Sequence, residues 1–171
     1  LGYRGKTWRV RTKGEEQVWT DENGDAVQGI QLVLIRSNEN LSKTYYEGDY
    51  AEGSNERPNC WSSNGKRPDS NVPNPVNATC QGCPMNAWGS RVNKKTGKPQ
   101  KACADVRRMA VIMDHELEAV AEGEKDLNEA TVLLLRVPGG SLNPLREYVE
   151  EKLAPKGGLL PYMLVTRVGF D

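Results

Sequence analysis

The chain has 171 residues, of which 37% are apolar, and its mean hydropathy is −0.68. This length fits a single domain, and the low hydropathy indicates one ordinary core with a polar insert. No run approaches the roughly 18 apolar residues that are needed to cross a membrane, and the first residues lack the apolar region of a signal peptide. We therefore expect a soluble, intracellular protein.

The chain holds 23 basic and 23 acidic residues, a balance that argues weakly against nucleic-acid binding. The charges are unevenly distributed, because residues 1–13 carry five basic side chains without an acid and residues 87–108 carry a net charge of +6. Residues 114–129 carry a compensating −6. Such segregation can create a positive face for an anionic partner, and solvated loops are the simpler alternative for either basic cluster.

Most elements expected along the chain are strands. The first has alternating apolar and basic residues, which is the period-two pattern of a half-buried strand, and the later ones are β-branched or apolar. Apolar residues at helical spacing after Ser141, which resembles an N-cap, predict one helix that ends by residues 156–158. The acidic segment 114–129 is expected to be a surface connection or a short helix. Strands are predicted over residues 6–12, 29–36, 42–47, 106–113, 131–137 and 161–170.

This order of three strands, an insert, two strands, a helix and a final strand predicts a mostly β, α+β fold. An OB-like antiparallel barrel with one helix is the preferred architecture, because that fold presents an open strand face to single-stranded nucleic acids. Residues 1–171 then form one OB-like domain, with residues 57–105 as an embedded Cys₄ metal-binding insert.

All four cysteines lie in the insert, in the pattern Cys60-x19-Cys80-x2-Cys83-x19-Cys103. The stretch holds five prolines and few apolar residues, and a loop of this length without regular structure needs another source of order. A tetrahedral zinc site formed by four thiolates supplies on the order of 10 kcal/mol. We therefore predict that Cys60, Cys80, Cys83 and Cys103 bind a structural Zn²⁺ ion.

Other uses of the four cysteines stay open. An iron–sulfur cluster is the main alternative, because Cys₄ ligation and the Cys83-Pro84 step both suit one. Two disulfides are less compatible with an intracellular chain, and a redox Cys-x-x-Cys motif should lie between a strand and a helix. His115, the only histidine, lies outside the cysteine pattern and is expected to be a bystander.

A basic surface with aromatic side chains is predicted around the first strand and the insert. Cations can follow the phosphates of a single strand while flat rings stack on its bases, at about 1–3 kcal/mol per stacked base. Each tryptophan has a core position as its alternative, and the alternation around Trp8 favours the core there. The predicted nucleic-acid contacts are Lys6, Trp8, Arg9, Arg11, Tyr45, Tyr46, Trp61, Trp88, Arg91, Lys94, Lys95, Lys98, Lys101 and Arg107.

No catalytic set is visible in the sequence, so a non-enzymatic protein is expected. A cysteine nucleophile paired with His115 would dismantle the metal site. The clustered acids Asp114, Glu116 and Glu118 could bind magnesium in a nuclease, but no second acidic cluster or basic catalytic residue completes such a site.

Three blocks around the cysteines and one later segment carry a resemblance to a known family. The blocks are Cys60-Trp-Ser-Ser-Asn-Gly-Lys-Arg-Pro-Asp69, Thr79-Cys-Gln-Gly-Cys-Pro-Met-Asn-Ala-Trp-Gly-Ser90 and Lys101-Ala-Cys-Ala-Asp-Val-Arg-Arg-Met-Ala-Val111, and the later segment is Ser141-Leu-Asn-Pro-Leu-Arg-Glu-Tyr148. Over roughly residues 60–168, the chain resembles phage-encoded, zinc-binding single-stranded DNA-binding proteins.

This resemblance implies an OB-like core with a zinc-bearing insert, in which the four cysteines are the ligands. It also implies non-sequence-specific binding of single-stranded DNA during phage DNA replication or recombination, in the host cytoplasm. Such proteins commonly end in an acidic tail that recruits partner proteins, and the 171 residues include no such tail.

Two further hypotheses remain beside single-stranded DNA binding. The first is a zinc-stabilised protein-interaction or transcription-regulating module, whose insert contacts a protein instead of DNA. The second is a magnesium-dependent nuclease or an iron–sulfur accessory protein.

Overall fold

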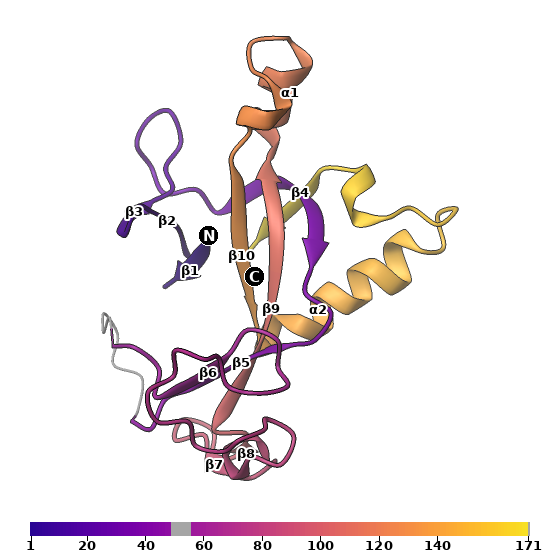
Figure 1. The fold of residues 1–171 in the computed structure, drawn as a ribbon. Helices are drawn as coiled ribbons and strands as arrows, with labels where there is room; N and C mark the ends of the chain where they lie inside the picture. Colours follow the sequence, from indigo (N-terminus) through magenta and orange to yellow (C-terminus); the bar gives the residue numbers. More distant parts are fainter. Residues whose placement is uncertain (49–55, 171) are drawn as a thin grey trace. The chain divides into compact units, whose positions relative to one another are not determined.

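A computed structural model of the chain describes residues 1–48 and 56–170. The chain forms two compact units, which we describe separately (Figure 1). The core unit comprises Leu1–Ser37 and Arg108–Asp171, and the cysteine unit comprises Asn38–Arg107. The sequence had predicted an insert over residues 57–105, whereas the cysteine unit begins at Asn38 and includes the strand before the insert.

The core unit begins with a three-stranded antiparallel sheet in the order β1-β2-β3. Both of its turns have two residues with positive φ, Gly5 and Lys6 in the first and Lys13 and Gly14 in the second. Positive φ at both central positions is the signature of a type I′ turn, whose twist matches that of the strands it joins. The strands are β1 (Gly2–Arg4), β2 (Thr7–Thr12) and β3 (Glu15–Val18).

The main sheet of the core unit is built around β4 and the later part of β9. Strand β4 pairs antiparallel with β11 on one side and with β9 on the other, and β10 also pairs with β9. The pairing of β4 with β9 has an irregularity between Leu34 and Arg36. The strands are β4 (Gly29–Ser37), β9 (Cys103–Met113), β10 (Val132–Pro138) and β11 (Thr166–Gly169).

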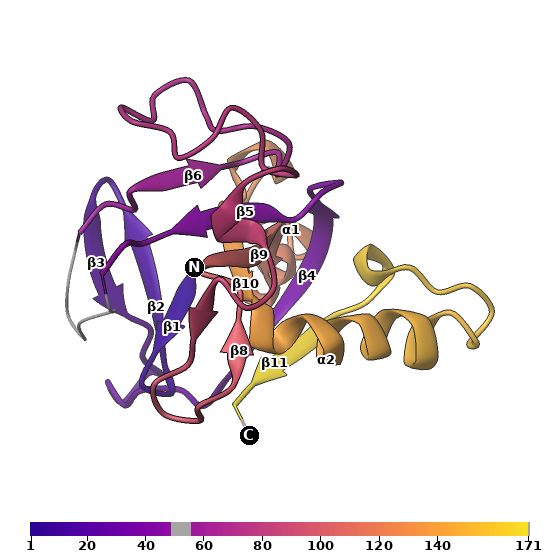
Figure 2. The same cartoon turned by 90° about the horizontal axis from the view of Figure 1, so that it is seen from below.

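Two α-helices complete the core unit. Helix α1 (Asp114–Ala121) directly follows β9, and α2 (Leu142–Glu147) continues without a break into a π-helical segment, Tyr148–Leu153 (Figure 2). Ser141 occupies the N-cap position of α2, as the sequence predicts, but it is also the last residue of a 3₁₀ turn and its side chain makes no capping hydrogen bond. Short 3₁₀ turns occupy Leu127–Glu129, Gly139–Ser141 and Pro161–Met163.

A single cluster of buried apolar side chains holds the core unit together. Trp8 is 2% exposed and stacks on Phe170, with ring centroids 5.0 Å apart, while Tyr3 meets both rings edge-on. The inward-facing residues of β4, β9 and β10 supply most of the rest, as their alternation predicts. The buried members are Trp8, Ile30, Leu32, Leu34, Met109, Val111, Met113 and Leu135.

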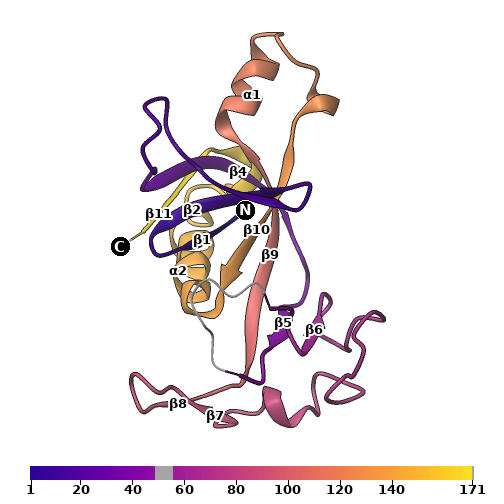
Figure 3. The same ribbon diagram turned by 90° about the vertical axis from the view of Figure 1, so that its left-hand side faces the viewer.

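The cysteine unit has little regular structure and few buried apolar side chains. Strand β5 (Ser42–Tyr45) pairs with β6 (Cys60–Ser62) and with the beginning of β9, and β7 (Arg91–Val92) forms a small hairpin with β8 (Pro99–Gln100). This hairpin extends away from β5 and β6 (Figure 3). Among the unit's described residues, Val72, Cys80, Ala102, Cys103 and Val106 are the buried hydrophobic ones.

The prediction of a mostly β, α+β fold with antiparallel pairing is confirmed, but with two α-helices instead of one. The strands in the described part of the chain do not close into a barrel, so the OB-like barrel is not confirmed. The last predicted strand, 161–170, is shortened to β11 because its first three residues form a 3₁₀ turn. No helix in residues 1–48 and 56–170 has the length and apolar character of a membrane span.

Candidate metal centre and nucleic-acid interface

The first and last cysteines are brought together by strand register. Tyr45 on β5 pairs with Cys60 on β6 and with Cys103 on β9, so these three residues form one row across three strands. Directly paired residues point to the same face of a sheet. Both thiols therefore lie on the face that carries the Tyr45 side chain, although 42 residues separate them in the sequence.

Cys80 and Cys83 lie in a tight turn that is fixed by backbone hydrogen bonds. The N–H of Cys80 donates to the carbonyl of Lys66 at 2.9 Å, and the N–H of Cys83 donates to the carbonyl of Cys80 at 3.4 Å. A 3₁₀ turn, Pro84–Asn86, follows at once, and Asn86 donates from its backbone N–H to the carbonyl of Cys83. The two-residue spacing thus places both thiols on one short loop, as the sequence had suggested.

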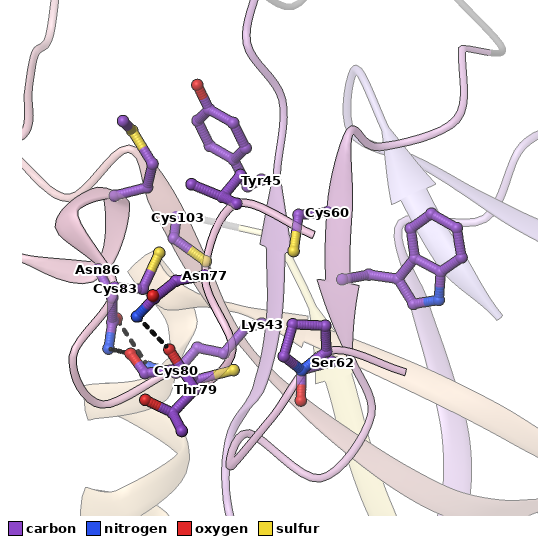
Figure 4. Close-up of a pocket in the computed structure, with 14 residues that line it drawn as sticks. Lys43, Tyr45, Cys60, Ser62, Asn77, Thr79, Cys80, Cys83, Asn86 and Cys103 are labelled. Carbon is purple, nitrogen blue, oxygen red and sulfur yellow. Dashed lines mark hydrogen bonds between the residues drawn. The ribbon is translucent and has the colours of Figure 1, made fainter. Parts of the chain in front are cut away.

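All four cysteines line one small cavity of about 20 Å³ (Figure 4). The four sulfur atoms lie around the same space, with the side chains of Asn77 and Asn86 beside them. A cavity of this size holds about one water molecule, and therefore also a single ion. In residues 1–48 and 56–170, no three histidine, cysteine or carboxylate side chains are already close enough together to hold an ion.

Burial disfavours the thiolate form of Cys103. Burial raises the pKa of Cys103 to about 11, with smaller increases from Cys83 and Cys80, while the nearby Lys43 opposes the change. Metal ligation requires the deprotonated thiolate, so binding of an ion would release protons and offset this penalty. Positive charge near the site favours the same thiolate form.

A polar clasp of four residues lies beside the cysteines. The ammonium groups of Lys43 and Lys101 both donate to the carboxylate of Asp105, and Lys43 also donates to the side-chain oxygen of Asn86 at 3.1 Å. Asn86 in turn donates from its side-chain nitrogen to the carbonyl of Cys80 at 2.9 Å. The clasp therefore joins β5 and β9 to the turn that carries Cys80 and Cys83.

Asp105 is ionised within this clasp. Burial alone would raise the pKa of its carboxyl group, but the hydrogen bonds from Lys101 and Lys43 outweigh burial and lower the pKa below its usual value. With Asp105 charged, the two lysines keep one net positive charge next to the four thiols. That charge suits a tetrathiolate site, which carries two net negative charges around a divalent ion.

The donor set fits zinc. Four thiolates are the ligands of a closed structural zinc site, and the cysteine unit has too few buried apolar residues to order its long loops by packing alone. Four thiolates also suit an iron–sulfur cluster, so the ligand chemistry leaves that alternative in place.

The predicted nucleic-acid residues in the β7–β8 region lie on the surface. Trp88 is 74% exposed, the largest exposed fraction among the large hydrophobic residues that the structure describes. Lys94, Lys95 and Lys98 are exposed in the turn of the hairpin. Asn93 fixes that turn, because its side-chain oxygen accepts from the backbone N–H groups of Lys95 and Thr96.

Three other cations predicted to contact nucleic acid are already hydrogen-bonded within the cysteine unit. Arg91 donates to the carbonyl of Tyr46 and lies over the Tyr45 ring, with its guanidinium carbon 5.9 Å from the ring centroid. Arg107 donates to the carbonyl of Asn38 at 2.7 Å, and Lys101 is bound in the clasp.

The predicted aromatic platform is also only partly exposed. Tyr45 and Tyr46 are half-buried, as is Trp61. Trp61 pairs with Thr44, so it lies on the opposite face of the strands from Cys60 and Cys103. Tyr45, by contrast, lies on the face of the two thiols and lines the cavity with them, so the rings of Tyr45 and Trp61 do not share one surface.

In the core unit, one predicted contact is a core residue. Trp8 is buried between Phe170 and Tyr3, so its ring is not offered for base stacking, and the prediction that placed it in the nucleic-acid surface is corrected. Lys6 is exposed in a hairpin turn. Arg9 and Arg11 share the carboxylate of Glu16 on the neighbouring strand, each at 3.3 Å.

Sequence reasoning missed two cations of the cysteine unit, Lys66 and Arg67. Both are exposed in the turn after β6. The signal that could have found them is the stretch Ser62-Ser-Asn-Gly-Lys-Arg67, in which Asn-Gly before two cations is typical of a tight turn that displays them.

In comparisons with known proteins, no family model, no curated protein and no solved structure matches the chain.

Proposed function

We propose that this protein binds single-stranded DNA without sequence specificity and without catalysis, and that a structural Zn²⁺ ion held by Cys60, Cys80, Cys83 and Cys103 orders its binding surface. The resemblance in the cysteine blocks adds the expectation of a role in phage DNA replication or recombination. An OB-like arrangement of the strands belongs to the same proposal and is supported by the antiparallel pairing around β4 and β9.

The observation that supports this function best is the exposure of Trp88. A side chain of this size normally loses most of its surface on folding, because burying it is favourable by several kcal/mol. Trp88 instead remains 74% exposed, two residues after the 3₁₀ turn that follows Cys83. A flat exposed ring on a loop anchored by metal ligands suits stacking on an unpaired base.

The charge of the cysteine unit supports the same function. Residues 38–107 contain ten basic and seven acidic residues, whereas the rest of the chain contains thirteen basic and sixteen acidic ones. The +3 of the cysteine unit includes Lys94, Lys95 and Lys98 of the β7–β8 turn, which follow Trp88 by six to ten residues. Cations around a stacking ring are the usual arrangement for tracking a phosphate backbone.

Binding of a labelled oligothymidylate over a series of salt concentrations tests the function. We expect the logarithm of the association constant to fall linearly with the logarithm of salt, by about 0.7 per phosphate contact on a single strand. The double variant Lys95→Gln/Lys98→Gln should reduce that slope by about 1.4 for two lost contacts. Salt-independent or undetectable binding by the unaltered protein at low salt would exclude the DNA function.

A matched control for this variant is Lys152→Gln/Lys156→Gln. It removes the same charge from two exposed lysines of the core unit, so it should leave the slope unchanged if the hairpin is the contact. Elemental analysis and the absorption spectrum of the same sample then distinguish one colourless zinc per chain from a coloured iron–sulfur cluster.

A protein-interaction module is the second candidate, and one observation favours it. A short stretch of the core unit between α2 and β11 exposes several large apolar side chains, which are Leu159, Leu160, Tyr162, Met163 and Val165. Contiguous exposed apolar residues are typical of contact surfaces. Zinc binding without any affinity for oligonucleotides would favour this second function over the first.

A further inference from the structure

The turn that follows β6 displays two cations whose side chains have no partner within residues 1–48 and 56–170. The side chains of Lys66 and Arg67 are exposed, and neither forms a hydrogen bond or an ion pair with the residues that the structure describes. They differ in this respect from Lys43, Lys101 and Arg107, whose charged groups are already bound within the cysteine unit.

A dense set of hydrogen bonds fixes the backbone of this turn. The Ser62 hydroxyl donates to the carbonyl of Arg67 at 2.5 Å and accepts from the N–H of Gly65 at 2.9 Å. The side-chain oxygen of Asn64 accepts from the backbone N–H groups of Lys66 and Arg67 at 2.9 and 3.3 Å. The carbonyls and N–H groups that a mobile loop would leave to water are therefore satisfied inside the turn.

Two further contacts close the turn. Asp69 accepts from both the backbone N–H and the hydroxyl of Ser63, at 2.8 and 2.7 Å. Gly65 has a φ of +69°, and a Cβ atom at this position would lie 2.1 Å from the carbonyl oxygen of Leu41. Only glycine fits there, because the backbone of the turn packs directly against the residue before β5.

The same turn is bonded to the cysteine site. The carbonyl of Lys66 accepts from the N–H of Cys80 at 2.9 Å, and the carbonyl of Cys80 accepts from the side chain of Asn86 at 2.9 Å. Asn86 ends the 3₁₀ turn that leads to Trp88. Hydrogen bonds thus connect the backbone of Lys66 to Cys80, a predicted metal ligand, and Cys80 to Asn86 at the start of the Trp88 loop.

We propose that the turn Ser62–Asp69 is a second phosphate-binding element for single-stranded DNA, in which Lys66 and Arg67 each contact a backbone phosphate. This inference rests on the proposed function and adds a contact site to it. Because the backbone of the turn is pre-organised, only the two side chains become ordered on binding. This lowers the conformational entropy that is lost when DNA binds. Arginine can also donate two parallel hydrogen bonds to one phosphate.

The double variant Lys66→Gln/Arg67→Gln tests the contact. We expect the salt slope for oligothymidylate to fall by about 1.4, with a loss of affinity on the order of tenfold at 0.1 M salt. Zinc content should remain one per chain, because both side chains are exposed and neither residue lines the cysteine cavity. The variant Lys152→Gln/Lys156→Gln is the control for the change in net charge.

The variant Gly65→Ala tests whether DNA binding requires the pre-organised backbone conformation of the turn. It keeps every charge but forces the backbone away from Leu41, so we expect a loss of affinity on the order of a few-fold, with zinc still bound. An unchanged affinity and slope in this variant would overturn the role of the turn geometry.

The outcomes separate this inference from the function on which it rests. If Lys95→Gln/Lys98→Gln lowers the salt slope and Lys66→Gln/Arg67→Gln does not, the inference is wrong and the function stands. If the unaltered protein shows no salt-dependent binding, both fall. If both double variants lower the slope by similar amounts, the two elements contact the same strand.

Discussion

At the scale of single residues, two tryptophans illustrate how burial decides between packing and recognition. Trp8 and Trp88 each have basic residues nearby in the sequence, so composition alone assigns them to the same surface. Trp8 is 2% exposed and Trp88 is 74% exposed. The difference arises from partners distant in the sequence, since Trp8 stacks on Phe170 near the other end of the chain.

These two residues should respond oppositely to truncation. Trp8→Ala should lower the free energy of unfolding by about 3–5 kcal/mol, because it leaves a cavity in the core cluster. Trp88→Ala should change stability by less than about 0.5 kcal/mol but weaken oligonucleotide binding by about 1–3 kcal/mol, the value of one stacked base. Urea unfolding followed by circular dichroism and a binding titration measure the two effects.

The milder variant Trp8→Phe keeps an aromatic ring against Phe170 and serves as the control for folding. It should retain the oligonucleotide affinity of the unaltered protein. If Trp8→Phe weakens DNA binding as much as Trp88→Ala does, the assignment of Trp8 to the core alone is wrong.

At the scale of elements, side-chain clasps hold segments that lack an apolar interface. Glu116 on α1 accepts from the Lys125 ammonium group and from the backbone N–H of Thr131 at 3.1 Å. These bonds tie α1 to the segment that enters β10, although α1 has no buried residue of its own. The hydrogen bond from Lys125, followed by that from Thr131, lowers the pKa of Glu116 below its usual value of 4.5.

The hydrogen bonds of Glu116 with Lys125 and Thr131 should make part of the free energy of unfolding depend on pH. Because the pKa of Glu116 is lower in the folded state, its carboxylate stabilises the fold fully above pH 4.5 and loses this effect as pH falls through the folded-state pKa. We expect Glu116→Gln to lower the free energy of unfolding by less than about 1 kcal/mol at pH 7, since the pair is near solvent.

The difference between Glu116→Gln and the unaltered protein should vanish in acid, when Glu116 is itself protonated. Urea unfolding at neutral and acidic pH measures it. Glu118→Gln, an exposed position on the same helix, should show no such pH-dependent difference. If the difference in the free energy of unfolding persists unchanged in acid, the role assigned to the Glu116 carboxylate is wrong.

The elements differ in how far the sequence could predict them. Strands β4, β9 and β10 were predicted because buried β-branched and apolar residues mark them, and β5 lies within the predicted strand 42–47. Strand β3 was missed because all four of its residues are exposed, so no alternation marks it. Strand β6 has only three residues and is defined by its pairing with β5, which is not a local property of its sequence.

The grouping of the four cysteines was predictable from the sequence, but their surroundings were not. Cysteine spacing identified the four thiols that line one cavity. It could not reveal that Lys101 binds Asp105 or that Arg107 binds the carbonyl of Asn38, since both depend on strand pairing. The sequence therefore predicted Lys101 and Arg107 as nucleic-acid contacts although both are bonded internally, and it did not indicate the exposed cations Lys66 and Arg67.

At the scale of the whole molecule, the two units are stabilised in different ways. The core unit has a buried cluster drawn from β2, β4, β9 and β10. The cysteine unit has short strands, hydrogen-bonded turns and few buried apolar side chains among its described residues. A small unit with so little apolar burial needs an additional cross-link, which the proposed metal would supply.

Removing the metal should therefore affect one unit more than the other. After treatment with a strong chelator, we expect hydrogen exchange to accelerate in β5, β6 and the β7–β8 hairpin, while β4 and β10 stay protected. Cys83→Ser should reproduce this pattern without a chelator. Equal loss of protection in both units, or none in either, would contradict the division of stabilising forces.

The row formed by Cys60, Tyr45 and Cys103 has a consequence for variation in length. Strand register positions the thiols of Cys60 and Cys103. The lengths of the loops on either side of Cys80 and Cys83 therefore do not determine where these two thiols lie. Residues could be gained or lost in those loops without moving the outer thiols, whereas a one-residue slip in β5 would reverse the face that Tyr45 occupies. Relatives of this protein would then be identified by the strands that flank their outer cysteines, more reliably than by a fixed cysteine spacing.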